Sequence, residues 1–315
     1  MSIEQEGLAE LRNHVEELRN KARERGIDVS AELGPLEAQL AAAHDEAMAR
    51  LSRFDRVKLA RNQDRPFSLD YIQGIGTDFF ELRGDRVFRD DPAIVGGWLK
   101  LDDRSVMVIG HQKGREMKEN LRRNFGSPHP EGYRKAKRLL RLAEKFGRPV
   151  ITFIDTQGAY PGIGAEERGQ AEAIARNLAV MAGLRVPIVS CVIGEGGSGG
   201  ALGIGVADRV LMMENAIYSV ISPEGCAAIL WRSREHSDKA AEALKLTARD
   251  LQDLGVVDQV IPEPRGGAHA DREAAVEAMG AAIRRHLREL AKREPAELVE
   301  SRRDKYDAIG AWEER

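Results

Sequence analysis

One glycine-rich stretch near the middle of the chain has the residue types and spacing of an anion-binding turn. Between Val189 and Asp208, an apolar run at residues 188–193 is followed by glycines at 194, 196, 197, 199 and 200, and then by a short apolar segment at 201–207. A strand that turns through glycine into a helix aims several free backbone N–H groups at one point, and glycine has no side chain to keep a ligand away. The pattern predicts a strand that breaks at Gly194 and a helix that begins after Gly197.

A second glycine-rich loop, at residues 155–164, directly follows the apolar run 150–154. The carboxyl ends of parallel strands meet at one edge of a sheet, where ligands bind, so we expect the two loops to lie side by side. Two loops of bare backbone cost conformational entropy, which a ligand would justify. Backbone donors suit an oxyanion, such as a thioester enolate, a urea enolate or a tetrahedral intermediate, and each donor contributes about 3–4 kcal/mol.

A dinucleotide site is the main alternative. The spacing Gly194-x-Gly196-x-x-Gly199 satisfies the dinucleotide-binding fingerprint, and Glu214 lies where a ribose-binding acid would lie. Against this interpretation, residues 201–207 are too short for a crossover helix and contain two further glycines. The alternative is a dinucleotide-dependent oxidoreductase. A P-loop is excluded, because no Gly-Lys-Ser or Gly-Lys-Thr occurs.

Three other interpretations of these residues stay open. The glycines could serve only to let helix and strand pack closely. Ser198 could be a hydrolase nucleophile, although its surroundings are not the G-x-S-x-G elbow and favour a turn residue. His111, at the end of an apolar run, could be a general base or a structural histidine.

A basic segment lies between these motifs. Residues 111–148 contain twelve Lys or Arg and four acidic residues, a local net charge of +8. This charge is typical of a solvated helix face. It also suits a phosphate-rich ligand such as coenzyme A, or an acidic protein partner.

The elements that must position these loops alternate in the manner of an α/β protein with a mostly parallel sheet. Strands are predicted at 93–101, 105–109, 150–154, 188–193, 209–213, 217–221 and 256–261. Helices are predicted at 133–146, 166–181, 239–254 and 273–292, and another starts at the Ser222 N-cap. Residues 5–60 read as an antiparallel helical pair broken at Gly34-Pro35, and the end of the chain is charged and expected to be loosely held.

The composition excludes several classes of function. The 315-residue chain is 42% hydrophobic and carries a net charge of −3, which gives no attraction to nucleic acid or to an anionic membrane. Aromatic residues make up only 5%, too few for stacking platforms that bind single strands. Cys191 and Cys226 lie in apolar runs and read as reduced core thiols. No signal-peptide core or membrane-length apolar run occurs, so we expect a cytoplasmic protein.

Several motifs in order resemble one family, the carboxyltransferase alpha subunit of multi-subunit acetyl-CoA carboxylase, within the crotonase superfamily. The resemblance covers about residues 65–267 and rests on residues 110–114, 123–126, 130–135, 158–162, 164–170, 194–202 and 222–226, with a helix and strand at 247–260. One departure occurs at Gln157, where the family pattern has Pro. Gln removes a constraint on φ and puts the rigidity of that loop in doubt.

The resemblance implies an α/β fold of the crotonase-like (ClpP/crotonase) type, a ββα superhelix with an N-terminal helical arm and a C-terminal helix. The implied boundaries are an arm at 1–60, a carboxyltransferase domain at 61–267, and a helix and charged tail at 268–315. The implied reaction moves the carboxyl group of carboxybiotin, held on a carrier protein, to acetyl-CoA, which gives malonyl-CoA for fatty acid synthesis.

The resemblance also implies the site residues and partners. Gly199 and Gly200 would hold the oxygen of the biotin enolate by their backbone N–H groups. The substrate-binding residues would be Gly158, Ala159, Tyr160, Gly162, Gly196 and Gly197. A beta subunit would complete an α2β2 enzyme that works with the biotin carboxyl carrier protein and biotin carboxylase. This chain would bind no cofactor or metal itself, and zinc is expected only in the beta subunit.

Overall fold

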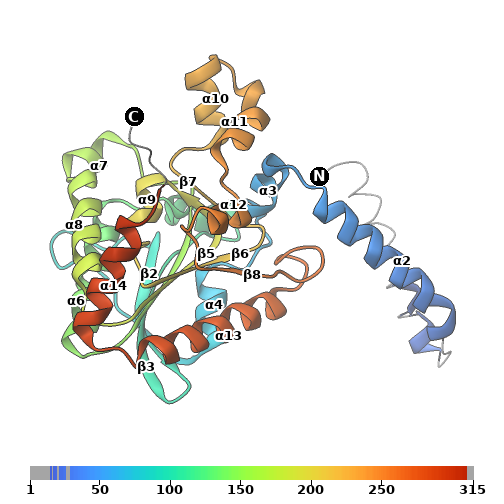
Figure 1. Ribbon diagram of the computed structural model, residues 1–315, viewed down its shortest axis with the longest axis horizontal. Coiled ribbons are helices and arrows are strands. Elements are labelled where there is room, and N and C mark those ends of the chain that lie inside the picture. Colours follow the sequence, from blue (N-terminus) through green and yellow to red (C-terminus); the bar gives the residue numbers. More distant parts are fainter. Residues whose placement is uncertain (1–14, 16, 20, 26–28, 311–315) are drawn as a thin grey trace.

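The computed structural model describes residues 15, 17–19, 21–25 and 29–310. Within them, an eight-stranded sheet is covered by helices, as predicted for an α/β protein (Figure 1). The strands are β1 (Thr77–Glu81), β2 (Ile94–Leu101), β3 (Arg104–His111), β4 (Val150–Thr156), β5 (Ile188–Gly197), β6 (Arg209–Met213), β7 (Ile217–Ser219) and β8 (Gln259–Ile261). β2 to β6 contain long runs of buried Val, Ile, Leu and Met, which is the composition of strands covered on both faces.

The strand order is β1-β2-β3-β4-β5-β6-β8, with β7 paired to β5 outside this path. β2 pairs antiparallel with both β1 and β3, and all later strand pairs are parallel. β5 changes its neighbour along its length. Its first half pairs with β6, and its last residues, Glu195 to Gly197, pair with β7. The carboxyl ends of β4 and β5 therefore lie together at one edge of the sheet.

The helices cover the sheet and extend beyond it. α6 and α8 pack side by side, and α4 packs against α13 (Figure 1). α2 extends away from the body of the molecule, and α10 and α11 project beyond the sheet edge (Figure 1). The α-helices are α2 (Ser30–Ala49), α3 (Arg53–Ala60), α4 (Ser68–Ile75), α5 (Met117–Arg122), α6 (Pro130–Lys145), α7 (Ile163–Glu167), α8 (Gln170–Gly183), α9 (Ser198–Leu202), α10 (Pro223–Trp231), α11 (Ser237–Leu244), α12 (Ala248–Asp253), α13 (Arg272–Leu290) and α14 (Pro295–Asp307).

Several predicted boundaries were wrong for local reasons. α2 runs through Pro35, so Gly34-Pro35 does not break it. The predicted helix 239–254 is two helices, because Lys245 adopts a left-handed conformation with φ of 48° between them. The predicted helix 166–181 is likewise divided at Gly169, with φ of 79°, into α7 and α8. Most of the first predicted helix of the arm lies outside the described residues.

Within the described residues, α14 is held firmly, contrary to the expectation of a loose charged tail. The guanidinium of Arg302 on α14 is 1% exposed and forms an ion pair of 2.9 Å with Asp208. It also donates hydrogen bonds to the carbonyl oxygens of Met181, Leu184 and Val186. α14 is therefore fastened to the segments that precede β5 and β6.

None of the described helices is long and apolar enough to cross a membrane.

Candidate active site

The glycine turn begins later than the sequence predicted. β5 continues through Gly194 to Gly197, because Gly196 and Gly197 pair with Tyr218 and Ser219 of β7. The turn itself is Ser198, whose φ of 52° is unusual for a residue with a side chain. α9 starts there, as predicted after Gly197. The prediction that the strand breaks at Gly194 is wrong, since the pairing with β7 involves residues about 20 positions further along the chain and could not be read from the sequence.

The glycines let the two predicted loops approach each other. A Cβ at Gly194 would lie 2.5 Å from Oδ1 of Asp155, and one at Gly197 would lie 2.2 Å from the carbonyl oxygen of Gln157. At Gly200 it would lie 2.4 Å from the backbone nitrogen of Ala159. Close packing therefore accounts for these three positions. Gly199 differs, because the nearest atoms to its added Cβ are methyl groups of Ile174 at 3.9 Å.

The same approach leaves backbone donors without acceptors. The described residues provide no recorded acceptor for the N–H groups of Gly199 and Gly200, and no side chain caps α9. In the facing loop, the N–H of Gly158 donates to Oγ1 of Thr156 at 3.0 Å, but that of Ala159 has no recorded acceptor in this part of the chain. Uncapped N–H groups at a helix start carry partial positive charge, so this corner can stabilise an anionic oxygen.

Two buried side chains hold α9 from behind. The hydroxyl of Tyr133, on α6, donates to the carbonyl oxygen of Gly200 at 3.1 Å. The amide of Asn177, on α8, donates to the carbonyl oxygen of Gly203 at 2.8 Å. Both side chains are fully buried. A five-residue helix has little stability of its own, so these bonds from two longer helices fix its position. Neither residue carries a sequence signal for this role, because their partners are distant backbone carbonyls.

A cavity of about 770 Å³ opens beside the second loop, a volume suited to a small ligand. Of the predicted site residues, Gly158 and Ala159 line this cavity, whereas Tyr160, Gly162, Gly196, Gly197, Gly199 and Gly200 are not among its lining residues. Its other walls come from residues 61–67, the basic segment, the second loop, the end of β5, and α10 with its flanking residues. They are Arg61, Asn62, Gln63, Phe67, Lys113, Gly114, Asn120, Phe125, Ser127, Gln157, Pro161, Glu195, Ser222, Glu224, Gly225, Ala228 and Arg234.

The cavity's main charged groups are paired with one another. Arg61 contacts Glu195 at 2.8 Å and Glu224 at 2.6 Å. Burial alone would raise the pKa of Glu224, but its hydrogen bond to Arg61 lowers that pKa below the ordinary value. Nζ of Lys113 lies 2.6 Å from Oδ1 of Asp155, which also accepts a hydrogen bond from the N–H of Glu195. Glu224 is therefore a poor proton acceptor at neutral pH, and the pairs fix the shape of the cavity.

Neither of the predicted side-chain alternatives is set up for nucleophilic catalysis. His111 is fully buried, and neither of its ring nitrogens has a hydrogen-bond partner in the described structure. Burial lowers its pKa to about 3, so the ring is neutral at pH 7. Ser198 is exposed, and the described residues include no recorded hydrogen bond between its hydroxyl and a histidine. Burial raises the pKa of Cys191 well above its ordinary value, which makes this thiol inert.

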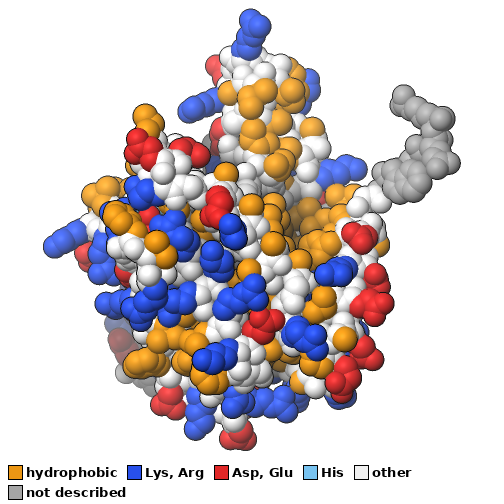
Figure 2. All heavy atoms as spheres, turned by 90° about the vertical axis from the view of Figure 1, so that its left-hand side faces the viewer, with side chains coloured by type: hydrophobic (Ala, Val, Ile, Leu, Met, Phe, Trp, Pro, Cys, Tyr) orange, Lys and Arg blue, Asp and Glu red, His pale blue; other side chains and the backbone are white. Residues whose placement is uncertain are grey.

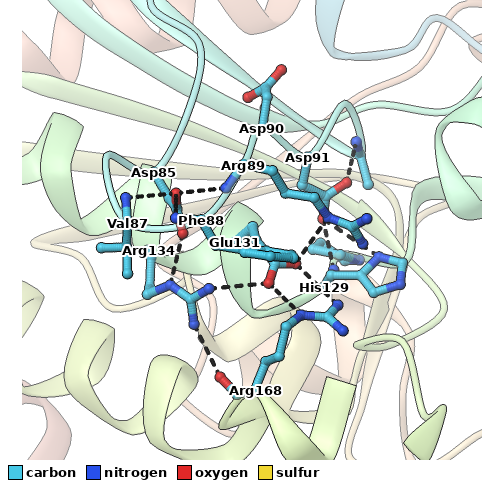
Figure 3. A network of polar contacts seen from close by, with 12 residues as sticks. Asp85, Val87, Phe88, Arg89, Asp90, Asp91, His129, Glu131, Arg134 and Arg168 are labelled. Carbon is cyan, nitrogen blue, oxygen red and sulfur yellow. Dashed lines mark hydrogen bonds and ion pairs between the residues drawn. The ribbon is translucent and has the colours of Figure 1, made fainter. Parts of the chain in front are cut away.

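Part of the basic segment is neutralised inside the protein. Glu131, on α6, has no exposed surface and accepts hydrogen bonds from Arg168 at 2.6 Å and from Arg134 at 3.0 Å (Figure 3). Arg134 also contacts Asp85 at 2.8 Å (Figure 3). Lys135 is buried and pairs with Asp90 at 2.5 Å. Part of the predicted patch is therefore a structural network, whereas Lys118, Arg122, Lys145 and Arg148 are exposed, as in the solvated face that the sequence also allowed.

This network supports the loop that carries Tyr160. The ring of Tyr160 stacks on His129 with centroids 4.2 Å apart, and its N–H donates to the carbonyl oxygen of Pro128. An added Cβ at Gly162 would lie 2.4 Å from the ring of Tyr160, so glycine is needed for this packing. Tyr160 and Gly162 therefore shape the loop.

The described residues contain no group of three or more side chains able to hold a metal ion.

The fold that carries the paired glycine loops is shared with solved structures of acyl-CoA-related enzymes. The 12S transcarboxylase structure with methylmalonyl-CoA and methylmalonic acid superposes with a TM-score of 0.55 at 21% identity, covering 72% of this chain and 44% of that chain. A Pseudomonas malonate decarboxylase hetero-tetramer in complex with coenzyme A gives a TM-score of 0.60 at 16% identity, covering 74% and 91%. At these identities the comparison establishes the fold, which is the predicted one.

Sequence comparison identifies the family. Residues 2–310 match the family described as acetyl co-enzyme A carboxylase carboxyltransferase-like, and the chain belongs to that family. The acetyl-coenzyme A carboxylase carboxyl transferase subunit alpha of Gemmatimonas aurantiaca is 56% identical over 310 residues, covering 98% of this chain and 96% of that protein. The subunit of the same name from Thermus thermophilus is 54% identical over 307 residues, covering 98% and 97%.

Family membership decides between the two predicted activities. The chain is an alpha component of a biotin-dependent carboxyltransferase of acetyl-CoA carboxylase, as the resemblance implied. The dinucleotide-dependent oxidoreductase alternative is wrong. Its physical basis fails as well, because α9 has only five residues and Gly194 and Gly196 lie within a paired strand. An alpha subunit implies a beta subunit as its partner and acetyl-CoA as a substrate of the complex.

Proposed function

We propose that the N–H groups of Gly199 and Gly200 hold the enolate oxygen of biotin during carboxyl transfer. The observation that carries this proposal is the start of α9, where these two N–H groups have no recorded acceptor within the described chain. The free N–H of Ala159, on the loop packed against Gly200, is suited to join them. Such donors stabilise developing negative charge without reorganising, by about 3–4 kcal/mol each.

In the proposed reaction, carboxybiotin loses CO₂ when the bond between its ureido nitrogen and carboxyl carbon breaks. The electron pair of that bond remains on the ureido group as an enolate, whose oxygen the alpha-subunit amides hold. The biotin anion then takes the α-proton of acetyl-CoA, and the resulting thioester enolate attacks CO₂ to form malonyl-CoA. Because biotin accepts the proton, no side-chain base is required, which agrees with the neutral, buried state of His111.

We propose that the six further residues shape the two loops around this site, although only two of them line the cavity. Gly158 and Ala159 line the cavity, and Tyr160 and Gly162 support the loop that they stand on. Gly196 and Gly197 permit β5 to approach β7 and the facing loop. Their contribution is to keep side chains out of the space between the two loops.

We propose that the beta subunit docks on the projecting pair α10–α11. Apolar side chains gather on this pair in Figure 2, and Ile229 is 73% exposed, Leu230 62% and the neighbouring Val220 75%. Exposed apolar patches mark interaction surfaces. α10 also provides Gly225 and Ala228 to the cavity wall, so a partner seated there would close the cavity.

We propose an α2β2 assembly in the cytoplasm. It would receive carboxybiotin on the biotin carboxyl carrier protein, after biotin carboxylase has carboxylated that biotin.

The test uses the co-purified alpha and beta subunits. We expect malonyl-CoA-dependent carboxylation of biocytin by the complex, no activity from the alpha chain alone, and no calorimetric signal with NADPH. Ile229→Asp and Leu230→Asp should prevent co-purification, whereas the same change at Val87, which is 77% exposed elsewhere, should not. A complex that assembles normally with both aspartates would refute the docking surface.

Zinc is proposed only in the beta subunit, so dialysis of the alpha chain against a chelator should leave its Tm unchanged.

A further inference from the structure

The segment Asn124–Gly126, at the wall of the cavity, has a costly backbone conformation. Three consecutive residues are left-handed, with φ of 47° at Asn124, 54° at Phe125 and 77° at Gly126. Asn and Gly tolerate this region, but a bulky residue such as Phe does so only under constraint. Strained residues of this kind persist where the surrounding structure fixes them, and they cluster at functional sites.

The surrounding structure does fix this segment. The buried guanidinium of Arg123 donates to the carbonyl oxygen of Pro92 and to Oε1 of Glu119, both at 2.9 Å. The side-chain nitrogen of Asn124 lies 2.9 Å from Nδ1 of His129. An added Cβ at Gly126 would lie 2.9 Å from Cγ of Lys113, so the chain passes close to the cavity floor. The residues on both sides of Phe125 are therefore anchored, and Phe125 lies between the anchors.

The result is an aromatic ring presented to the cavity. Phe125 lines the cavity together with Gly158 and Ala159, and it remains 42% exposed. For the isolated chain this arrangement is unfavourable twice, because the backbone is strained and an apolar ring is left partly in water. A ligand that covers the ring would recover the second cost.

We propose that Phe125 is a substrate-contacting residue that packs against the fused bicyclic ring of biotin. This inference rests on the proposed function of the Gly199 and Gly200 amides, which lie against the loop of Gly158 and Ala159 that lines the same cavity as Phe125. The ring system of biotin is uncharged and has apolar faces, which suits an aromatic wall. Two of the three cations that line the cavity offer no free charge to a phosphate, because Lys113 pairs with Asp155 and Arg61 pairs with Glu195 and Glu224, which leaves only Arg234. The nucleotide end of coenzyme A is therefore the poorer match for this wall.

The first experiment separates binding from turnover in the alpha–beta complex. Phe125→Ala should raise the KM for biocytin about tenfold, equivalent to about 1.4 kcal/mol, and change kcat and the KM for malonyl-CoA less than about twofold. Phe125→Tyr keeps the ring and should retain the wild-type KM. Phe146→Ala is the matched control, since Phe146 is 57% exposed at the end of α6 and does not line the cavity. It should leave all three parameters unchanged.

A second experiment uses the strain itself. Phe125→Gly removes the left-handed penalty, so it should raise the Tm of the alpha chain by about 2 °C while raising the KM for biocytin as Phe125→Ala does. A merely structural phenylalanine would give a lower Tm and an unchanged KM.

Three results would overturn the inference or its basis, and they are distinguishable. An active complex in which Phe125→Ala has the wild-type KM for biocytin refutes the role of Phe125 alone. A variant that weakens assembly of the two subunits with that KM unchanged shows a contact with the partner chain instead. Failure of the proposed function would appear in the wild type, as an assembled complex that does not carboxylate biocytin.

Discussion

Gly199 and Gly200 are adjacent and identical, yet the structure predicts opposite responses to the same substitution. The added methyl group of Gly200→Ala would lie 2.4 Å from the backbone nitrogen of Ala159 and 2.5 Å from the carbonyl carbon of Gly158. The methyl group of Gly199→Ala would contact only Ile174, at 3.9 Å. Both variants retain their backbone N–H, so the comparison tests the position of the donors and leaves their number unchanged.

The magnitude follows from the overlap. Ordinary contact begins near 3.4 Å, so the α9 turn and the facing loop must separate by about 1 Å to accommodate the methyl group that Gly200→Ala adds. A displacement of about 1 Å at a reacting centre costs about 10²-fold in rate, and loss of one oxyanion donor costs about 10²–10³. We therefore expect kcat to fall by about 10²–10³ in Gly200→Ala and by less than about threefold in Gly199→Ala.

The assay is malonyl-CoA-dependent carboxylation of biocytin by the alpha–beta complex, with kcat and both KM values measured. Size-exclusion chromatography and Tm measurements establish that each variant is folded and assembled. An assembled Gly200→Ala complex with wild-type kcat would refute the reasoning. Equal losses in the two variants would also refute it, because the steric difference between the two positions would then have no consequence.

Three further predictions concern the support of this site. Tyr133→Phe removes the hydrogen bond to the carbonyl oxygen of Gly200, a bond that contributes about 1 kcal/mol. We therefore expect kcat to fall about fivefold and the KM for biocytin to stay unchanged. An unaltered kcat would show that α9 does not depend on this hydrogen bond. His111 has a native pKa of about 3, below the unfolded value of about 6.5, so the unfolded state binds the extra proton as the pH falls. Between these two pH values, His111 should therefore lower the free energy of unfolding by about 1.4 kcal/mol for each pH unit of acidification. Chemical denaturation at about pH 7, 6 and 5 should show a shallower decline in His111→Phe than in the wild type. Arg302→Met leaves Asp208 buried without its cation, which should cost about 3–5 kcal/mol in the free energy of unfolding measured by urea titration. The double variant Arg302→Met with Asp208→Asn should recover part of this loss. A single variant as stable as the wild type would contradict the assigned role of the pair.

The sequence carries the order of the elements and the location of the site because both have local signals. Short apolar runs followed by glycine-rich segments identify β4 and β5, and the shared direction of these strands brings the two loops to one edge. The start of α9 after Gly197 was predicted correctly for the same reason. The domain boundaries and the individual site residues remain predictions.

The parts that the sequence did not reveal depend on distant partners. The last residues of β5 contain three glycines and have low strand propensity, yet they pair with β7, because tertiary pairing overrides local preference. The tail reads as charged and loose, since a buried Arg302 cannot be distinguished from an exposed one without Asp208. The charge of +8 in residues 111–148 is also misleading, because acids outside that segment, such as Asp85 and Asp90, neutralise part of it.

The change of neighbour along β5 has a consequence for how the protein is made. The strand is flanked by β4 and β6 over its first half and by β7 over its end, so the turn at Ser198 is bracketed by segments from residue 150 to residue 219. A nascent chain that has emerged from the ribosome only as far as α9 contains every proposed amide donor and β4, but it lacks β6 and β7, which flank the other side of β5. Contacts between distant segments form slowly, so the catalytic corner should be among the later parts of the domain to mature during synthesis.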